Sequence, residues 1–383
     1  MAIYLTWFIV IVALYLFGHK ETKRARNVYI LGSYLMGLAL FVGLADMLGG
    51  YDRYIYADLF DSMADVTRSG GNPFLSNSFL FYKSDFGYGT YCALISYLTA
   101  NRYIFILITT LVIYTLLFVS LKDYVNDYSF AVIIFMGLFF FFTFTYLRQV
   151  MGVMTAWLSV RYIIKRKLIP FLIVVFIAYS LHNSAIIFLP LYFIPVKKYS
   201  IGVVITLMVV CLFIGLSSVP SSLFEIYGET IEERANAEGY AKEVGFRFEY
   251  LLESIVFLGF ILFEYSHIPN KKGNIVLLNI ALLFCATLLI FIRSENGGRL
   301  AWYYMIGMIA TLTLLATRKR KVSFYGIGLI ALSFMLYFRI LYAWGIQLSP
   351  YKTFLTDGIR EGDYIEEKYE DRKSTRLNSS HGY

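Results

Sequence analysis

Long apolar runs alternate with short polar connectors along most of this chain. Runs of about 20 apolar residues, the length that crosses the ~30 Å hydrocarbon core of a bilayer, recur along nearly the whole sequence. We expect about ten full transmembrane helices, at residues 2–18, 28–48, 103–121, 128–147, 150–164, 201–217, 250–265, 275–292, 300–316 and 324–343. No small-residue cleavage site follows the first run, so we expect it to be retained as a span. The pattern predicts an all-α polytopic membrane protein.

Two further apolar segments do not fit a single crossing. Residues 87–100 are too few for an ordinary span, and residues 168–195 would form one helix of ~40 Å, too long for one tilted span. Cationic residues flank the second segment at 165–167 and 197–198, and such clusters favour the cytoplasmic side. We therefore expect residues 168–195 to double back near 181–184, and residues 87–100 to form a re-entrant or interfacial helix.

The positions of Lys and Arg set the expected orientation. All the cationic clusters can face the cytoplasm if residues 87–100 do not cross; they lie at 19–26, 165–167, 197–198, 271–272 and 318–321. The N-terminus then lies outside. The formal net charge of +8 is mostly this inner-loop excess, so it does not indicate nucleic-acid binding.

The longest polar stretches, residues 49–101 and 218–249, are expected on the outer side. In the first, Tyr54, Phe60 and Met63 recur near helical spacing opposite acidic residues, which predicts a short amphipathic helix at the membrane surface. We expect one integral-membrane domain over residues 1–355 and an outer-face tail over 356–370. Residues 371–383 resemble the translation of a sequencing adaptor and are expected to be foreign to the natural protein.

The sequence contains no nucleotide-binding loop, zinc-ligand spacing or nucleophile elbow. Its three cysteines, Cys92, Cys211 and Cys285, are odd in number, far apart and set in apolar surroundings. They predict neither a disulfide framework nor a metal site. The sequence therefore gives no reason to expect a metal, a cofactor or a nucleotide-sugar donor.

The expected topology collects the notable polar residues on the outer side. These are Asp52, Arg148, His182, Arg293, Arg299 and the Pro350-Tyr351 pair. The cytoplasmic side offers only anchoring cations. Any chemistry is therefore expected at the outer face.

Three arginines are candidates for binding an anion. Arg148, next to Gln149, is expected in a tight outer turn with no acidic residue nearby, and a guanidinium fork suits phosphate or diphosphate oxygens. An interfacial arginine that snorkels to the lipid headgroups would show the same pattern. Arg293 and Arg299 flank the short outer connector between two expected spans. Ordinary anchoring of span ends explains one of these arginines better than both. Arg299 is the better candidate for anion binding.

Two residues are candidates for proton transfer, and each allows a second interpretation. His182, beside Ser184, is either a general acid or base on an outer cavity or a hydrogen-bonded core histidine at a helix break. Asp52 is either a base for a sugar hydroxyl or simply the N-cap of the surface helix.

Short motifs in a fixed order resemble the EpsG-type polysaccharide polymerases, relatives of the Wzy O-antigen polymerases. The resemblance covers roughly residues 1–355. It rests on Gly50-x-Asp52-x-x-x-Tyr56, Asp85-x-Gly87-Tyr88, Arg148-Gln149, His182-x-Ser184 before Pro190, Arg299 at the start of a late span, and Pro350-Tyr351-Lys352. Asp85 stands where the family has a glutamate as often as an aspartate, so a structural and a catalytic role both stay open for it.

The resemblance implies a bacterial inner-membrane glycosyltransferase of the metal-independent, lipid-donor kind, with a GT-C-like architecture and no cofactor. Such enzymes join oligosaccharide repeat units carried on undecaprenyl diphosphate at the periplasmic or outer face, for O-antigen, capsule or exopolysaccharide. Membrane lipids, and the chain-length regulator and flippase of the same pathway, are further expected partners. Nucleic acid is not.

The resemblance also suggests roles for the residues. Asp52 or His182 would act as the base, and Arg148, Arg299 and Arg293 would bind the diphosphate. The supporting residues would be Gln149, Ser184, Tyr56, Asp85 and Tyr351.

Other membrane functions remain as alternatives: a ligase for lipid-linked glycan, an acyltransferase, and a flippase or transporter of lipid-linked oligosaccharides. A flippase should carry cations through the depth of a central cavity. Charges inside the expected spans are few, the nearest being Arg161, Glu264 and Arg339. Since the polar candidates collect on one face, the pattern favours an enzyme with a fixed site.

Overall fold

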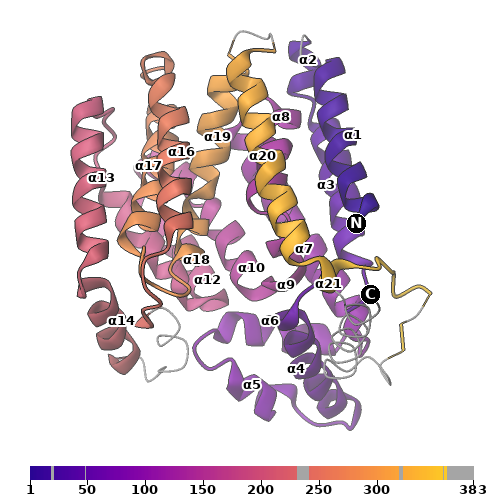
Figure 1. Ribbon diagram of the computed structural model, residues 1–383. Coiled ribbons are helices and arrows are strands. Elements are labelled where there is room, and N and C mark those ends of the chain that lie inside the picture. Colours follow the sequence, from indigo (N-terminus) through magenta and orange to yellow (C-terminus); the bar gives the residue numbers. More distant parts are fainter. Residues whose placement is uncertain (19–20, 48, 231–240, 319–321, 357, 360–383) are drawn as a thin grey trace, which may run out of the picture.

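The long apolar runs form helices that stand side by side, and residues 49–101 form further helices at one end of them (Figure 1). The computed structural model describes residues 1–18, 21–47, 49–230, 241–318, 322–356 and 358–359. Within these ranges the chain contains helices and two isolated bridges, and no strand. The predicted all-α class is confirmed for this part of the chain.

The first half of the chain supplies the N-terminal helices and the helices of the polar stretch. In chain order they are α1 (Ala2–Gly18), α2 (Thr22–Ala25), α3 (Val28–Gly43), α4 (Tyr51–Arg68), η1 (Pro73–Leu75), α5 (Asn77–Phe81), α6 (Phe86–Ser96), α7 (Arg102–Tyr124), α8 (Tyr128–Leu138), α9 (Phe142–Thr145), α10 (Leu147–Trp157) and α11 (Val160–Ile164).

The second half begins with the segment that doubles back and ends with α20 and the short α21. Its elements are α12 (Leu168–Leu181), η2 (Asn183–Phe193), α13 (Ile201–Leu216), α14 (Val219–Thr230), α16 (Phe248–Phe263), η3 (Tyr265–His267), α17 (Lys272–Ile290), α18 (Gly298–Ala301), η4 (Trp302–Tyr304), α19 (Met305–Ala316), α20 (Phe324–Ala343) and α21 (Gly345–Leu348).

Within the described residues, four helical stretches are long and apolar enough to cross a membrane: α7, α17, α20, and Gly298–Ala316, which combines α18, η4 and α19. A fifth is obtained if α13 and the first part of α14, bent by 63° at their junction, count as one span. Five shorter apolar helices, α1, α3, α8, α12 and η2, accompany them. The protein is a multi-pass membrane protein, and the expected total of about ten spans stays a prediction.

Two of the short elements follow the expectation closely. The segment at residues 87–100 forms α6, a helix of 11 residues. Residues 168–195 double back at His182: the ring of Tyr192 on η2 lies 5.1 Å from that of Phe171 on α12, and Nη1 of Arg166 donates to the Tyr192 carbonyl at 2.8 Å. The short helix and the doubling back are confirmed, and the re-entrant or interfacial position of α6 stays a prediction.

One expected span is broken instead of continuous. Residues 128–147 were predicted as a single helix, but α8 ends at Leu138, and α9 and α10 follow after Phe139–Phe141. These three phenylalanines are almost fully buried and face different neighbours: Phe139 contacts Trp157 and Phe141 contacts Tyr337. The break directs the Phe139 ring to α10 and the Phe141 ring to α20. Arg148 therefore lies in the first turn of α10, not in a tight turn between two spans.

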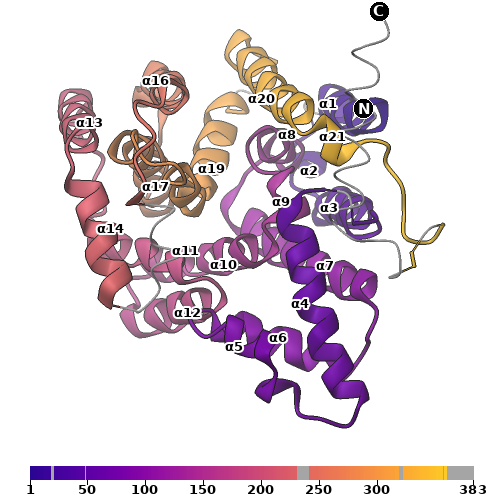
Figure 2. The ribbon, with the colours of Figure 1, turned by 60° about the horizontal axis from the view of Figure 1, so that its bottom comes forward.

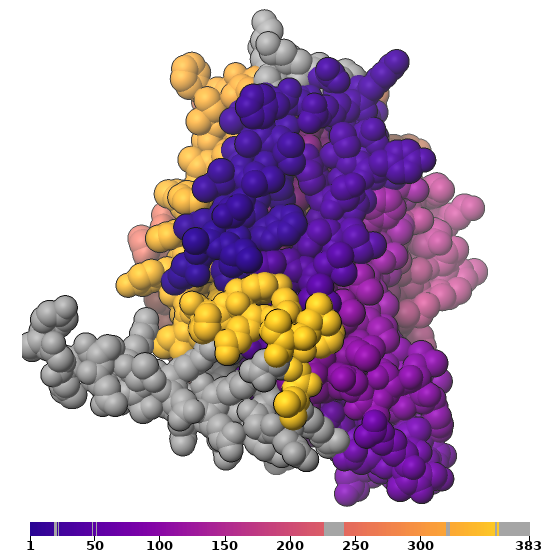
Figure 3. Space-filling model, turned by 90° about the vertical axis from the view of Figure 1, so that its right-hand side faces the viewer, coloured from indigo at the N-terminus to yellow at the C-terminus, as the bar shows by residue number. Residues whose placement is uncertain are grey.

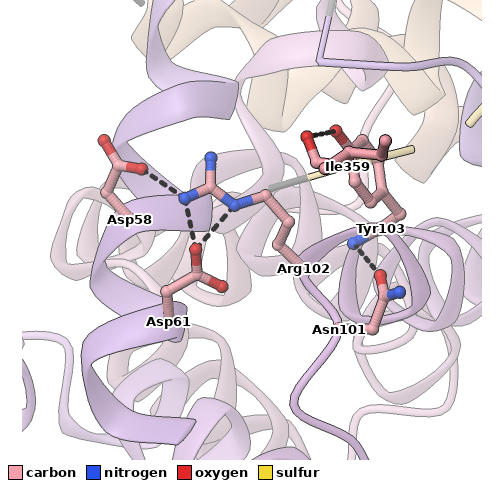
Figure 4. Close-up of polar contacts among 6 residues, drawn as sticks. All are labelled: Asp58, Asp61, Asn101, Arg102, Tyr103 and Ile359. Atoms are coloured by element: carbon pink, nitrogen blue, oxygen red, sulfur yellow. Dashed lines mark hydrogen bonds and ion pairs between the residues drawn. The ribbon is translucent and has the colours of Figure 1, made fainter. Parts of the chain in front are cut away.

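The predicted amphipathic helix is α4, and arginines fix it at both ends. The fully buried Arg53 donates to the carbonyls of Val42 at 3.3 Å, Ala45 at 2.8 Å and Phe144 at 3.3 Å, which ties α4 to the end of α3 and to α9. Near the other end, Arg102 at the start of α7 holds two carboxylates of α4 (Figure 4).

Arg102 donates through Nε to Asp61 at 2.6 Å and through Nη2 to Asp58 at 2.8 Å (Figure 4). The sequence pattern placed Asp58 and Asp61 together on the solvent face of this helix. Asp58 is exposed, but the side chain of Asp61 is only 2% exposed because the guanidinium covers it. The acidic face is thus partly a packing face.

The C-terminal segment crosses the base of the N-terminal helices (Figure 3). The Asp46 N–H donates to the Lys352 carbonyl and the Phe354 N–H donates to the Leu44 carbonyl, both at 3.1 Å. Tyr351 stacks on Phe41 with ring centroids 4.4 Å apart. Most of the expected tail at 356–370, and all of residues 371–383, lie outside the described residues.

Gly50 offers a test of how α4 is seated. It precedes α4 with φ of 141°, and a Cβ there would lie 2.3 Å from Oγ1 of Thr145. We expect Gly50→Ala to destabilise the fold by about 1–3 kcal/mol, because the variant is strained and clashes. Thermal unfolding of the detergent-solubilised protein checks this. Gly202→Ala, where a Cβ meets nothing within 4 Å, is the control and should not lower the midpoint.

Candidate active site

Four polar side chains from distant parts of the chain meet at the end of the bundle that carries α4 and α6. They are Asp52 in the first turn of α4, Arg148 in the first turn of α10, His182 between α12 and η2, and Arg299 in α18. Arg148 and Arg299 both act electrostatically on Asp52 and on His182. In Figure 2, α10 and α12 run side by side with α6 and α4 close to them. We call these four residues the polar cluster.

A buried ion pair fixes Arg148. Its Nη1 lies 2.6 Å from Oδ2 of Asp85, whose side chain is fully buried, while the Arg148 side chain is 14% exposed. The other oxygen of Asp85 accepts the backbone N–H of Asn183 at 2.7 Å. Asp85 therefore joins the start of α6, the first turn of α10 and the break after His182.

Close backbone packing brings α6 to that position. A Cβ on Gly87 would lie 2.2 Å from Oγ of Ser180, so only glycine lets α6 approach α12 this closely. The Asp85-x-Gly87 pair thus has a physical basis: the glycine permits the approach and the aspartate uses it.

Aromatic rings complete the surroundings of Arg148. Tyr56 on α4 interacts with it electrostatically, and the Arg148 guanidinium lies 5.8 Å from the ring centroid of Tyr82. A guanidinium enclosed by a carboxylate and aromatic faces is held in one orientation. Tyr56 and Asp85, both predicted as supporting residues, contact the arginine directly.

Arg299 is held differently. Its guanidinium stacks 4.3 Å from the ring centroid of Tyr146 and donates to the Tyr146 hydroxyl at 3.2 Å, while its carbonyl accepts from Nε2 of Gln149 at 3.3 Å. No carboxylate of the described residues forms an ion pair with it. Arg299 is therefore the cation of the cluster that is most open to an external anion, and Gln149 ties it to the helix that carries Arg148.

His182 is oriented by a short hydrogen-bonded chain. Its Nδ1 accepts the backbone N–H of Ser184 at 3.3 Å and lies 2.7 Å from the Ser184 hydroxyl, which is 3.0 Å from the hydroxyl of Tyr303. Because a backbone N–H can only donate, Nδ1 is an acceptor, and the neutral ring carries its proton on Nε2. The ring is thus set to donate from Nε2.

Asp52 is not the cap of its helix. The N-cap position is Gly50, and no side chain caps α4. Burial raises the pKa of the Asp52 carboxyl above its ordinary value of 3.8, while the positive charges of Arg299 and Arg148 act in the opposite direction. A half-buried carboxylate beside two cations, without a capping role, is suited to proton transfer.

Comparison with known protein families identifies the family of the chain. A family model described as the EpsG family matches residues 33–353. The chain belongs to the EpsG family. The resemblance expected from its motifs is confirmed, and membership indicates a polysaccharide polymerase or a related membrane enzyme. No curated protein and no solved structure matches the chain.

Two residues predicted for the EpsG-family site lie in other contacts. Arg293 forms an ion pair with Glu243 and donates to the Leu216 carbonyl at 3.0 Å, which joins the end of α13 to the loop after α17. Tyr351 donates to the Phe41 carbonyl at 2.8 Å and packs against the N-terminal helices. Within the described residues, no three His, Cys, Asp or Glu side chains form a group suited to a metal ion.

Three residues that position the cluster were not predicted from the sequence. Tyr303 lies four positions after Arg299, and since residues at that spacing share a helix face, it could have been found. Tyr146, two residues before Arg148, carries no such signal because the helix break separates them. Arg53 is one position from Asp52, and its burial could not be read from its charge.

The ion pair of Asp85 can be tested by stability. Asp85→Ala leaves the guanidinium of Arg148 without its carboxylate, and we expect a loss of about 3–5 kcal/mol. The exposed pair of Glu295 and Lys242, 3.1 Å apart, is the control: Glu295→Ala should cost about 0–1 kcal/mol.

The double variant Asp85→Ala/Arg148→Ala separates the pair from ordinary packing. It should cost clearly less than the sum of the two single variants, because neither charge is left alone. Thermal unfolding in one detergent measures all four proteins, and additive losses would contradict the proposed coupling.

Proposed function

We propose that the protein is a membrane glycosyltransferase that polymerises undecaprenyl-diphosphate-linked oligosaccharide repeat units at the outer face of the bacterial cytoplasmic membrane. The observation that carries the proposal is the meeting of Asp52, Arg148, His182 and Arg299 in a member of the EpsG family. The arrangement offers two cations for a diphosphate and a carboxylate for a hydroxyl. Both are needed when a sugar leaves a diphosphate carrier for an acceptor.

The proposed membrane arrangement is a GT-C-like bundle of about ten spans with the cluster facing outward. The helices α1 and α3, 17 and 16 residues long, extend about 25 Å at 1.5 Å per residue, close to the hydrocarbon thickness. The helices α4 to α6 and the polar cluster lie at one end of the bundle. The basic helix α2 lies at the opposite end (Figure 1). Cations favour the cytoplasm, which supports an outer position for the cluster.

In the proposed reaction, an acceptor hydroxyl oxygen attacks the anomeric carbon of a lipid-linked sugar. The carbon–oxygen bond to the diphosphate breaks, and the bonding electrons leave with the undecaprenyl diphosphate. Arg299 and Arg148 oppose the negative charge that develops there. Arg299 contributes most directly, since Asp85 already occupies Arg148.

Asp52 is the proposed base that takes the proton of the acceptor hydroxyl. The raised pKa makes its carboxylate a better proton acceptor than an exposed aspartate. His182 is proposed to donate a hydrogen bond from Nε2 to the substrate, because its Nδ1 is already occupied by Ser184. The two candidates for the base thus take different roles.

The guanidinium fork of Arg148 is the first test. Arg148→Lys keeps a positive charge beside Asp85 but loses the fork, and we expect polymer formation to fall about 10²- to 10³-fold with membrane insertion preserved. The readout is the length distribution of surface glycan on gels from a deletion strain carrying each variant. Arg161→Lys is the matched control, because Arg161 pairs with Asp123 at 3.2 Å on α11 and α7, outside the cluster.

The deletion strain itself distinguishes the alternatives. Loss of a polymerase leaves single repeat units displayed, loss of a flippase leaves none, and loss of a ligase accumulates polymer on the lipid carrier. Long polymer in the Arg148→Lys strain, or no displayed units in the deletion strain, would contradict the proposal.

The pH dependence tests Asp52. We expect the polymerisation rate to fall at acid pH as Asp52 takes up a proton, with a midpoint above the ordinary 3.8. Arg299 lowers the pKa of Asp52, so Arg299→Gln should raise this pKa further. The acid side of the pH–rate profile, where the rate falls, should then move to higher pH. Rates of the solubilised wild type and variant across pH measure the shift, with Arg161→Lys as control. An unchanged or more acid limb in Arg299→Gln would exclude Asp52 as the base.

A further inference from the structure

A separate cavity of about 150 Å³ lies on the other side of Arg299. Helices α8, α16, α17, α19 and α20 surround it, and its wall is mostly apolar, with Leu138, Phe284, Leu288 and Met305 among the lining residues. Arg339 of α20 also lines it and is 56% exposed, so the cavity reaches the surface of the bundle there.

The cavity has charged groups in otherwise apolar helices. Nη2 of Arg339 lies 2.9 Å from Oε1 of Glu253 on α16, and both side chains line the cavity together with Arg299. Charged groups in spans are costly and are usually retained for a function. Two guanidinium groups face one carboxylate, so the cavity carries a net positive charge and favours an anion.

Arg299 connects this cavity with the polar cluster. It lines the cavity beside Phe142 and Trp302, and it also acts electrostatically on Asp52 and His182. A ligand whose negative charge lies at Arg299 can therefore have one end in the cavity and the other at the cluster.

We propose that the cavity binds the lipid side of the donor: the diphosphate bridges Arg299 and Arg339, and the first isoprene units lie against the apolar wall. This inference rests on the proposed function and adds the direction in which the donor lies. The sugar then points to Asp52 and His182, and the polyprenyl chain leaves between α16 and α20 into the bilayer.

Three observations favour a polyprenyl diphosphate over other occupants. The apolar wall fits a hydrocarbon, the excess of guanidinium groups fits a diphosphate, and Arg339 lies in the last turns of α20 near the end that carries α21. Glu253 takes the place of an anion beside Arg339, so a bound diphosphate would compete with it.

A second groove supplies the control. It has a volume of about 220 Å³, lies between α3 and α7, and is lined by residues such as Met36, Leu111 and Phe118, with no charged side chain among them. A lipid tail should enter both grooves non-specifically, whereas a diphosphate should favour only the cavity with arginines.

The test is photo-crosslinking of the full chain in lipid nanodiscs with labelled undecaprenyl diphosphate that carries no sugar. A photoreactive phenylalanine analogue replaces Leu336 at the cavity or Met36 at the control groove. We expect labelling at Leu336 to exceed that at Met36, and Arg339→Gln to reduce it about tenfold, as for loss of a charge-assisted hydrogen bond. Glu253→Gln, which removes the competing carboxylate, should raise it.

Equal labelling at the two positions would overturn the inference. So would labelling at Leu336 that changes with neither Arg339→Gln nor Glu253→Gln. Size-exclusion profiles identify any variant that has failed to fold, and the Glu253→Gln result then still decides. Polymerisation is measured separately with the unlabelled protein. Specific labelling without polymerisation would contradict the proposed function alone, and polymerisation without specific labelling would contradict the cavity alone.

Discussion

The buried ion pair of Asp85 and Arg148 is the interaction on which the candidate site depends. A carboxylate without exposed surface is tolerated only with a close cation and further hydrogen bonds, and Asp85 has the guanidinium at 2.6 Å and the Asn183 N–H at 2.7 Å. These two contacts require α6, α10 and the break after α12 to lie together. The place of His182 follows from them, because it is the residue before Asn183.

This pair also divides the work between the two arginines of the polar cluster. Arg148 is compensated from inside the protein, so its charge mainly sets geometry and the local potential. Arg299 rests on the face and hydroxyl of Tyr146, which orient a guanidinium without neutralising it. One arginine is therefore part of the framework, and the other is free to respond to a ligand.

Much of this arrangement is predictable from the lengths of the hydrophobic runs and the positions of the cations, because both constrain a membrane chain strongly. They predicted α4, the short α6, the doubling back at His182, and the gathering of Arg148, His182 and Arg299 at one end. The family was recognisable because its short motifs fall at fixed places relative to the spans.

Other features could not be predicted from the sequence. The pairing of Asp85 with Arg148 joins residues from separate helices and depends on the close approach at Gly87, a matter of backbone packing. The break at Phe139–Phe141 contains no proline, and the glycine just before it, Gly137, lies inside α8 against Ser333. The capping role considered for Asp52 was wrong, because Gly50 occupies the N-cap position and the helix begins at Tyr51.

The contact between residues 44–46 and 352–354 has a consequence for how the protein is made. Arg53 anchors the helix of Asp52 to the Val42 and Ala45 carbonyls, beside the stretch that pairs with the C-terminal segment. In a chain inserted from its N-terminus, the pairing of residues 44–46 with residues 352–354 can form only after α20 has entered the membrane. The pairing that closes over the loop before α4 therefore forms as a late step of biogenesis, when the rest of the bundle is already in the membrane.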